Sequence, residues 1–317
     1  MRAFITGIGG FVGSHVAEHL LAQAWQVSGC LSPRGRDQLL LPIKDRLDLC
    51  QVEITDAEAL GEALAQRRPE MIVHLAGLAH VGSSFSAAAA TLRINLFGTL
   101  AVLEASRGLE PRPALVLAGS SEVYGAVDPR LQPLREDAPT EPDNPYGVSK
   151  LAAELLARQA GRDQGFRVVC ARCFNHIGPR QEPNFLVASI AFQIARMEAG
   201  KQEPVLWVGN LESQRDFTDV RDIARAYRCL AEAGRAGQSY NVASGRAVKI
   251  AQVVEAFRTL ATVDFEVRVD PNRLRPSDPA LKLGDAGKLQ AESGWRAEIG
   301  LEDSLRDTLD YWRGRLA

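Results

Sequence analysis

Short apolar runs alternate with longer amphipathic segments through the first half of the chain. Short continuous apolar runs are typical of strands buried on both faces, and segments whose apolar residues recur every three to four positions are typical of helices. The predicted strands are RAFITG, QVSGCL, LCQVEI, MIVHLAG, ALVLAGSS and RVVCARCF. The predicted helices are GSHVAEHLLAQA, DAEALGEALAQR, a long helix across Ser86–Gly108, and one that begins at Pro145. This alternation predicts an α/β fold with a doubly wound parallel sheet covered by helices.

The pattern loosens from RVVCARCFNHIGP onward, where proline, asparagine and arginine become frequent between shorter elements. This half contains the predicted helices SIAFQIARMEAG and IAQVVEAFRTLA and the predicted strand VLWVG. We therefore expect residues 1–170 to form the sheet domain, with later segments returning to it, and residues 171–317 to form mainly a smaller lid. Doubly wound sheets bind ligands beyond the carboxyl ends of their strands, which places the chemistry near Gly7, Gly77 and Ser120.

The bulk composition fits a globular enzyme and argues against several other classes of protein. Of 317 residues, 46% are hydrophobic and 24% are charged, which is ordinary for soluble domains. A net charge of −2 argues against a sequence-independent nucleic-acid binder, which needs a strong positive field. The sequence shows no apolar run of the roughly 18–20 residues that a membrane span needs, and MRAFITGIGG carries no signal-peptide pattern. We expect a cytoplasmic protein with no nucleic-acid or membrane partner.

Five cysteines are an odd number and are widely spread, which argues against a disulfide framework. Cys170 and Cys173 have the CxxC spacing of zinc and redox sites, but they lie in the predicted strand RVVCARCF. Positions three apart on a strand point to opposite faces, so the two thiols should diverge. We interpret them as packing residues and predict no metal site.

A glycine-rich segment, TGIGGFVGSH, joins the first strand to the first helix. Gly7, Gly10 and Gly13 give the pattern G-x-x-G-x-x-G, and Gly9 adds a G-x-G spacing. Glycine permits a tight turn, a close approach of backbone to a pyrophosphate, and tight packing of helix on strand. The helix N-terminus then offers free N–H groups to the anion. In this strand–loop–helix position the segment predicts a dinucleotide site, and residues 1–170 become an NAD(P)-binding domain of the Rossmann type.

The tip of the second strand favours one dinucleotide over the other. NAD-binding proteins often place a carboxylate there for the ribose hydroxyls, and no acid stands near Leu31 and Ser32. The segment SPRGR instead supplies Ser32, Arg34 and Arg36, which suit a 2′-phosphate. The sequence favours NADP(H), with NAD(H) possible. The alternative interpretation is a solvated basic loop.

Two segments carry candidate catalytic side chains. In DNPYGVSKLAAELL, Tyr146 and Lys150 are four residues apart, which places the phenol and the ammonium on one helix face. Taken alone, this pair also fits a solvated polar face. The strand ALVLAGSSEVYG ends in Ser120, Ser121 and Glu122, so its hydroxyls are placed to bind a substrate oxygen over the predicted nicotinamide.

Over nearly its whole length the chain resembles the extended short-chain dehydrogenases/reductases, the NAD-dependent epimerase/dehydratase family of nucleotide-sugar enzymes. The motifs that carry the resemblance are the glycine loop, HLAGLAHV, INLFGTLAVLEA, GSSEVYG, YGVSK, FNHIGP, RDFTDVRD, YNVASG and RPSD. The resemblance implies that Tyr146 is the general acid/base, its pKa lowered from about 10 by Lys150 and an oxidised nicotinamide. It implies that Lys150 also holds the nicotinamide ribose and that Ser120 binds the reacting oxygen. Glu122 aligns with the glutamate that abstracts the C5 proton in dehydratases, although reductases can also carry an acid there.

The same resemblance implies sets of binding residues, with the 171–317 lid binding the substrate. Asn95 would support the cofactor side of the site, and Arg215 and Arg275 would clamp the pyrophosphate of a sugar nucleotide. The implied cofactor-binding residues are Gly7, Gly10, Phe11, Val12, Gly13, Ser32, Arg34, Ile54, Leu75, Ala76, Gly77, Asn95, Tyr146 and Lys150. The implied substrate-binding residues are Ser84, Ser121, Asn175, Arg215 and Arg275.

Within this family, the segments 174–222 and 270–285 are most similar to the reductases of GDP-4-dehydro-6-deoxy-D-mannose, which implies NAD(P)H-dependent reduction at C4 of a GDP-linked sugar to GDP-D-rhamnose. A GDP-mannose 4,6-dehydratase or another nucleotide-sugar epimerase or dehydratase is the alternative. A non-enzymatic dinucleotide sensor would not need Ser120, Tyr146 and Lys150 together. The broad apolar faces of the helices at Ser86–Gly108 and after Pro145 predict a homodimer, which the family forms as a four-helix bundle.

Overall fold

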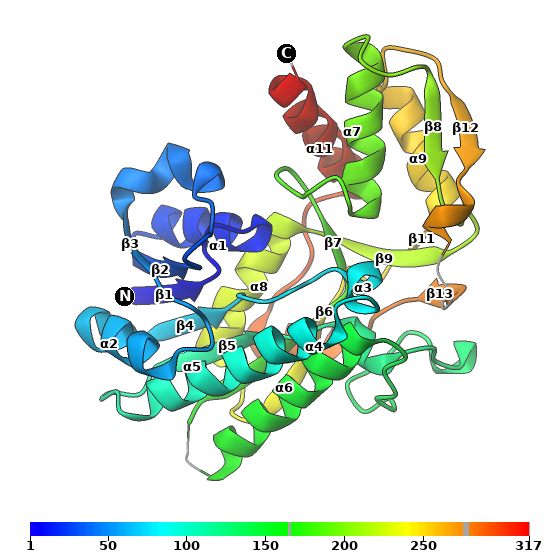
Figure 1. Ribbon diagram of the computed structural model, residues 1–317. Coiled ribbons are helices and arrows are strands. Elements are labelled where there is room, and N and C mark those ends of the chain that lie inside the picture. Colours follow the sequence, from blue (N-terminus) through cyan, green and yellow to red (C-terminus); the bar gives the residue numbers. More distant parts are fainter. Residues whose placement is uncertain (164–165, 275–278, 317) are drawn as a thin grey trace.

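The computed structural model describes residues 1–163, 166–274 and 279–316, and its largest sheet has seven parallel strands (Figure 1). These strands are β1 (Arg2–Thr6), β2 (Gln26–Leu31), β3 (Leu47–Gln51), β4 (Met71–His74), β5 (Ala114–Ala118), β6 (Val168–Cys173) and β10 (Gln238–Val242). Their order across the sheet is β10-β6-β5-β4-β1-β2-β3, so the winding direction reverses between β1 and β4. This topology confirms the predicted doubly wound sheet of the Rossmann type.

Helices cover both faces of the sheet (Figure 1). One face carries α1 (Phe11–Ala22), α8 (Val220–Ala233) and α10 (Gly287–Ser293), and the other carries α2 (Ala57–Arg67), α5 (Gly98–Arg107) and α6 (Pro145–Asp163). Alternate residues of β6 enter these two cores: Cys173 packs with α1 and α8, whereas Cys170 packs with α2, α5 and α6. The structure therefore confirms that the two thiols diverge, and both are free.

The third strand lies two to three residues earlier than its apolar pattern predicts. Leu47–Gln51 pairs with β2, and the N–H of Val52 donates the last bond, to the carbonyl of Leu31 (2.9 Å). Val52 and Ile54 are buried in the core under α5, outside the ladder. Buried residues are apolar whether they lie in a strand or in the segment after it. The apolar pattern alone therefore placed the third strand too far along the chain.

One helix runs from Ala88 to Arg107, built from α4 (Ala88–Leu92), a π-helical turn η2 (Arg93–Phe97) and α5; the short α3 (Val81–Ser84) precedes it. Among the described residues it is the one helix that is long and apolar enough to cross a membrane, with a mean hydropathy of 1.2, and this corrects the expectation of no such segment. Small residues such as the alanines at 87–90 raise the hydropathy without a run of large apolar side chains. Core helices of globular proteins meet the same criterion, and α5 packs against α2 and α6.

The remaining elements form a lid beside the carboxyl ends of the strands (Figure 1). Its small sheet joins β7 (Asn175–Ile177), β9 (Gln214–Asp219), β11 (Ala247–Lys249) and β13 (Leu281–Lys282), and a second ribbon pairs β8 (Val205–Val208) with β12 (Glu266–Val269). The helices α7 (Leu186–Glu198), α9 (Ile250–Leu260) and α11 (Leu301–Leu316) enclose a third core against these strands. Short 3₁₀ helices are η1 (Gln38–Arg46), η3 (Ser121–Tyr124), η4 (Pro129–Leu131) and η5 (Pro271–Arg273).

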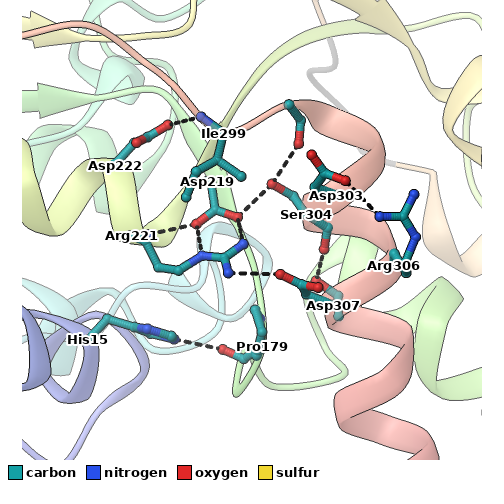
Figure 2. A network of polar contacts seen from close by, with 12 residues as sticks. His15, Pro179, Asp219, Arg221, Asp222, Ile299, Asp303, Ser304, Arg306 and Asp307 are labelled. Atoms are coloured by element: carbon teal, nitrogen blue, oxygen red, sulfur yellow. Dashed lines mark hydrogen bonds and ion pairs between the residues drawn. The ribbon is translucent and has the colours of Figure 1, made fainter.

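A polar junction, drawn in Figure 2, ties the lid to the sheet domain. Asp219 ends β9 and caps α8 by accepting from the N–H of Arg221 (2.8 Å), and it also accepts from the Ser304 hydroxyl of α11 (2.6 Å). The Arg221 guanidinium bridges Asp219 to Asp307 of α11, each at 2.8 Å. Burial alone would raise the pKa of Asp219, but the hydrogen bonds from Arg221 and Ser304 outweigh it and lower the pKa below its usual value.

Candidate active site

The glycine loop forms a cradle at the end of β1. Gly7 has φ +67°, and a Cβ there would lie 2.9 Å from the backbone of Ala76. A Cβ on Gly13 would lie 2.8 Å from the Cα and the carbonyl oxygen of Ile8, so only glycine lets α1 pack this closely on the loop. Gly10 is the N-cap and brings no capping side chain, which leaves first-turn N–H groups available to an anion. Phe11 and Val12 follow as the first, half-buried residues of α1.

The basic loop after β2 folds over this cradle. The carbonyl of Arg36 approaches Gly9 so closely that a Cβ at that glycine would collide with it. The N–H of Gly35 donates to the carbonyl of Ser32 (2.8 Å), which closes a turn in which Ser32, Arg34 and Arg36 are all exposed. Neither arginine forms an ion pair with another described residue. The loop thus carries two exposed arginines and passes close to the glycine segment that would hold a dinucleotide.

A buried hydrogen-bond chain supports the loop after β4, and three of its side chains, Thr6, His74 and Thr99, were not predicted from the sequence. Thr6 accepts from the N–H groups of Leu75 and Ala76, each at 3.2 Å, and donates to Nδ1 of His74 (2.8 Å). The Thr99 hydroxyl donates to the carbonyl of Asn95 (2.8 Å), so Nε2–H of His74 donates to Thr99 (3.2 Å). Burial lowers the pKa of His74 to about 3 and keeps it neutral. A polar residue inside the apolar strand MIVH was the available signal.

Asn95 holds the same loop from behind. It lies in the π-helical turn η2, a feature that is frequent at functional sites. Its side-chain oxygen accepts from the N–H of Leu78 (2.8 Å), and its amide nitrogen donates to the Leu78 carbonyl (3.1 Å) and to Ser149 of α6 (2.8 Å). Asn95 therefore supports the loop after β4, and its predicted role on the cofactor side stays a prediction. Ile54 is likewise buried, packed against Gly98.

Ser120, Tyr146 and Lys150 come together at the end of β5. Ser120 accepts from the N–H of Glu122 (3.2 Å), and its hydroxyl is hydrogen-bonded to that of Tyr146. Nζ of Lys150 donates to the carbonyl of Ala118 (2.9 Å) and lies 5.9 Å from the centroid of the Tyr146 ring. A Cβ on Gly77 would be 3.7 Å from this Nζ, so the lysine also reaches the loop after β4.

Burial controls the protonation of this pair in the protein without cofactor. It raises the pKa of Tyr146 above its usual value, and the hydrogen bond to Ser120 offsets only part of the effect. The predicted lowering of this pKa by Lys150 together with an oxidised nicotinamide concerns the cofactor complex and stays a prediction; in the protein without cofactor, desolvation is the larger effect. Burial also lowers the pKa of Lys150 to about 8. Near pH 7 the phenol keeps its proton and can deliver it.

Lys282 and Asn144 both hold Glu122 at the mouth of the site. Its Oε1 accepts from Nζ of Lys282 (2.8 Å), and its Oε2 accepts from the side-chain amide of Asn144 (3.0 Å). Asn144 also caps α6, since its Oδ1 accepts from the N–H of Gly147 (2.8 Å). Lys282 was not identified from the sequence, and the only available signal was a cation in the apolar run LKL.

A cavity of about 540 Å³ lies between the sheet domain and the lid. Glu122, Asn144, Asn175, Arg215 and Lys282 line it, together with His80, Val81 and Phe85. Asn175 is exposed to it from β7, and the guanidinium of Arg215 donates to the carbonyls of Gln214 (2.8 Å) and Pro279 (2.7 Å). This is a cavity large enough for a sugar nucleotide's polar half.

Two predicted substrate residues, Ser84 and Ser121, do not line this wall. The hydroxyl of Ser84 is buried and donates to the carbonyl of Val81 (2.6 Å), so its neighbours on α3 face the cavity in its place. Ser121 is buried at the start of η3. Arg275 lies outside the described residues, so its predicted contact with pyrophosphate is not tested. Among the described residues, no group of three or more His, Cys, Asp or Glu side chains could hold a metal ion.

Comparison with known proteins gives matches over almost the whole chain. A family model described as GDP-mannose 4,6 dehydratase matches residues 4–308. The GDP-6-deoxy-D-mannose reductase of Pseudomonas aeruginosa is 39% identical over 317 residues, which cover 99% of this chain and 98% of that protein. The structure of RMD from Pseudomonas aeruginosa complexed with NADPH has a TM-score of 0.86 at 38% identity, with 99% of both chains covered. The UDP-glucose 4-epimerase of Thermus thermophilus in complex with NAD has a TM-score of 0.88 at 29% identity, again covering 99% of both chains.

Proposed function

Because the chain belongs to the GDP-mannose 4,6-dehydratase family, we propose that it is an NAD(P)H-dependent reductase of the 4-keto group of a nucleotide-linked 6-deoxy sugar. The substrate we favour is GDP-4-dehydro-6-deoxy-D-mannose, and the product is GDP-D-rhamnose. The observation that carries this proposal is the buried phenol of Tyr146, which burial keeps protonated beside Ser120 at the end of β5. Reduction of a ketone needs an acid that delivers a proton to the oxygen, and this geometry provides one.

The cofactor supplies a hydride to C4, and the residues of the cradle fit a dinucleotide phosphate. Gly7 and Gly13 leave no room for a side chain where the backbone must approach a pyrophosphate. Arg34 and Arg36 lie on the loop that covers the cradle, where a 2′-phosphate would need a cation. We therefore favour NADP(H), in keeping with the NADPH complex of the Pseudomonas aeruginosa relative. The NAD complex of the Thermus thermophilus epimerase keeps NAD(H) possible.

Three side chains take part in the proposed proton transfer to the C4 oxygen. Ser120 holds the C4 oxygen by a hydrogen bond, and Tyr146 donates its phenolic proton to that oxygen as negative charge develops there. Lys150, anchored on the Ala118 carbonyl, places a cationic group behind the phenol and so stabilises the phenolate that remains. Solvent then restores the proton to Tyr146 for the next turnover.

Recognition of the nucleotide sugar is assigned to the lid. Arg215 projects into the cavity from β9, and we propose that it binds the pyrophosphate, together with Arg275. Asn175 on the neighbouring β7 would bind the sugar or the phosphate. Guanine is the base we favour because the family model and the reductase of Pseudomonas aeruginosa are both named for GDP-linked sugars.

A dehydratase is the second candidate, and Glu122 is the observation that favours it. This carboxylate lines the cavity close to Tyr146 and could remove a proton from the carbon next to the C4 ketone. A dehydratase or an epimerase takes and returns the hydride within one cycle, so neither consumes cofactor. A non-enzymatic sensor is a third reading, which the assembly of Ser120, Tyr146 and Lys150 disfavours.

We further propose a homodimer. Phe97 is 54% exposed at the end of η2, and Val148 and Leu155 of α6 are 44% and 54% exposed. These large apolar side chains stand on two helices that pack side by side, which suits an isologous contact with the same helices of a second copy. Light scattering at micromolar concentration should give twice the monomer mass, and a monomer mass would refute the dimer.

The deciding experiment follows NADPH absorbance while the protein is supplied with GDP-4-dehydro-6-deoxy-D-mannose and with UDP- and dTDP-linked 4-keto sugars. A reductase consumes one NADPH for each sugar reduced and prefers the GDP-linked substrate. The control is GDP-mannose with NADP⁺, which a dehydratase converts to the 4-keto sugar without net change in cofactor. Conversion of GDP-mannose in the absence of NADPH oxidation would overturn the reductase assignment in favour of the dehydratase.

A further inference from the structure

The Glu122–Lys282 ion pair crosses from the sheet domain to the lid. Glu122 lies in η3 at the end of β5, whereas Lys282 lies in β13 of the small lid sheet, 160 residues further along the chain. Lys282 is only 4% exposed, and its Nζ is 2.8 Å from the glutamate oxygen. A lysine this buried needs an anionic partner, because the desolvation of an ammonium costs several kcal/mol.

The strand register adds a second reason for the pair. Lys282 is the direct neighbour of Arg215 across the β13–β9 ladder. Paired positions on adjacent strands point to the same face, so two cations stand side by side at the cavity wall. Like charges in this arrangement are destabilising. Arg215 faces the proposed pyrophosphate position, and Glu122 is the carboxylate that compensates Lys282.

The pair also engages a carboxylate that lines the cavity close to Tyr146. In a 4-keto sugar the hydrogens on C3 and C5 are acidic, since the electrons of a broken C–H bond move into the C4 carbonyl to form an enolate. A carboxylate beside the ketone can take such a proton while Tyr146 stabilises the enolate oxygen. Both oxygens of Glu122 accept hydrogen bonds, from Lys282 and from Asn144. These bonds hold the carboxylate in place and compete with an incoming proton for the lone pairs of its oxygens.

We propose that Lys282 is a positioning residue that restrains Glu122 and thereby confines the site to reduction at C4, with the C5 hydrogen left in place. This inference rests on the proposed function. With Lys282 in place, the site only reduces the ketone. Without it, the site would also exchange the hydrogen on the adjacent carbon or support an elimination there. Replacing Lys282 should release Glu122 to take the C5 proton and return a proton from solvent, a step in which no electrons are gained or lost.

The test measures exchange of the C5 hydrogen. The protein is incubated in D₂O with GDP-4-dehydro-6-deoxy-D-mannose and NADP⁺, so that no net reduction takes place. Samples are then reduced chemically and analysed by NMR, which separates deuterium at C5 from deuterium at C3. The variants are Lys282→Met and Lys282→Gln, each alone and combined with Glu122→Gln. Lys288→Met on α10, whose Nζ bonds to Gln238 (3.0 Å) and the Ser239 carbonyl (2.8 Å) away from the cavity, is the matched lysine control.

We expect C5 exchange in both single Lys282 variants to be about ten- to hundred-fold faster than in the unmodified protein, the factor that corresponds to one charge-assisted hydrogen bond. Adding Glu122→Gln should abolish the gain, and Lys288→Met should not show it. Exchange in the unmodified protein as fast as in the variants would overturn the proposal, as would a folded Lys282→Gln variant that reduces the sugar without exchanging C5. If the unmodified protein neither binds nor reduces the 4-keto sugar, the proposed function fails first, which NADPH oxidation reports separately.

Discussion

Substitution of Gly13 by alanine tests the cofactor cradle most directly. The added Cβ would lie 2.8 Å from the Cα and the carbonyl oxygen of Ile8, whereas ordinary van der Waals contact begins at 3.4 Å. The carbonyl oxygen of Gly7 is closer still, so the helix and the loop must separate by more than 0.6 Å, the difference between these two distances. Because the close atoms are all backbone, no side chain can rotate away to absorb the strain. The shift moves the first-turn N–H groups of α1, which are the proposed phosphate donors.

Two magnitudes follow from this geometry. Overpacking of a tight site costs about 1–3 kcal/mol, and the better helix propensity of alanine returns about 0.5–1 kcal/mol, so the free energy of unfolding should fall by about 0–2.5 kcal/mol. Loss of one charge-assisted hydrogen bond to the pyrophosphate corresponds to about ten- to hundred-fold in NADPH affinity. Urea unfolding measures the first quantity, and fluorescence titration with NADPH measures the second.

Gly61→Ala is the matched control. Gly61 lies inside α2, and a Cβ there would meet no atom within 4 Å. This substitution should raise the free energy of unfolding by about 0.5–1 kcal/mol and leave NADPH affinity unchanged. If Gly13→Ala binds NADPH as tightly as the unmodified protein does, the loop is not the phosphate cradle, whatever its effect on stability.

Four further perturbations have defined outcomes. Tyr146→Phe should fold normally and lose about 10²–10⁴-fold in kcat, and a near-native rate at saturating substrate would place the acid elsewhere. Arg34→Ala with Arg36→Ala should erase a roughly ten- to hundred-fold preference for NADPH over NADH, and equal kcat/KM for both cofactors in the unmodified protein would refute it. Arg215→Ala should mainly raise the KM for the sugar nucleotide; an unchanged KM removes it from the site. Asp219 has a lowered pKa, so it stabilises the fold above its unfolded pKa of about 3.9, and the contribution disappears as pH falls through the folded value. Urea unfolding should thus show a stability gap to Asp219→Asn that narrows in acid, and a gap independent of pH would contradict this.

Local patterns in the sequence predicted the elements that depend on neighbouring residues. The apolar strands, the glycine loop and the Tyr146–Lys150 helix face are set by spacings of a few residues, and the structure has them where the sequence indicates. The third strand was misplaced because Val52 and Ile54 are buried in the segment that follows the strand. Burial of that kind depends on α5, which lies some fifty residues further along the chain.

The parts of the site that escaped prediction depend on distant segments meeting in space. Lys282 and Glu122 are 160 residues apart in the sequence, and no local pattern of charge predicts that they form an ion pair. The raised pKa of Tyr146 likewise follows from burial, which the sequence does not give for a residue at a helix start. The support of the β4 loop by Thr6 and His74 joins side chains 68 residues apart. Motifs predict which groups take part, whereas packing decides their protonation and their partners.

The junction at Asp219 also sets how this protein can be recombined with its relatives. The chain leaves β9 of the lid at that residue, enters α8, and then adds β10 to the edge of the main sheet beside β6. A chimera with a single crossover near residue 170 would therefore combine α1 and the first strands of one parent with α8 and β10 of the other inside one core. Transfer of substrate preference requires several crossovers that keep 220–242 with the first parent while exchanging the strands that carry Asn175, Arg215 and Lys282. In this fold, the strands proposed to bind the substrate are separated along the chain by a segment that belongs to the main core.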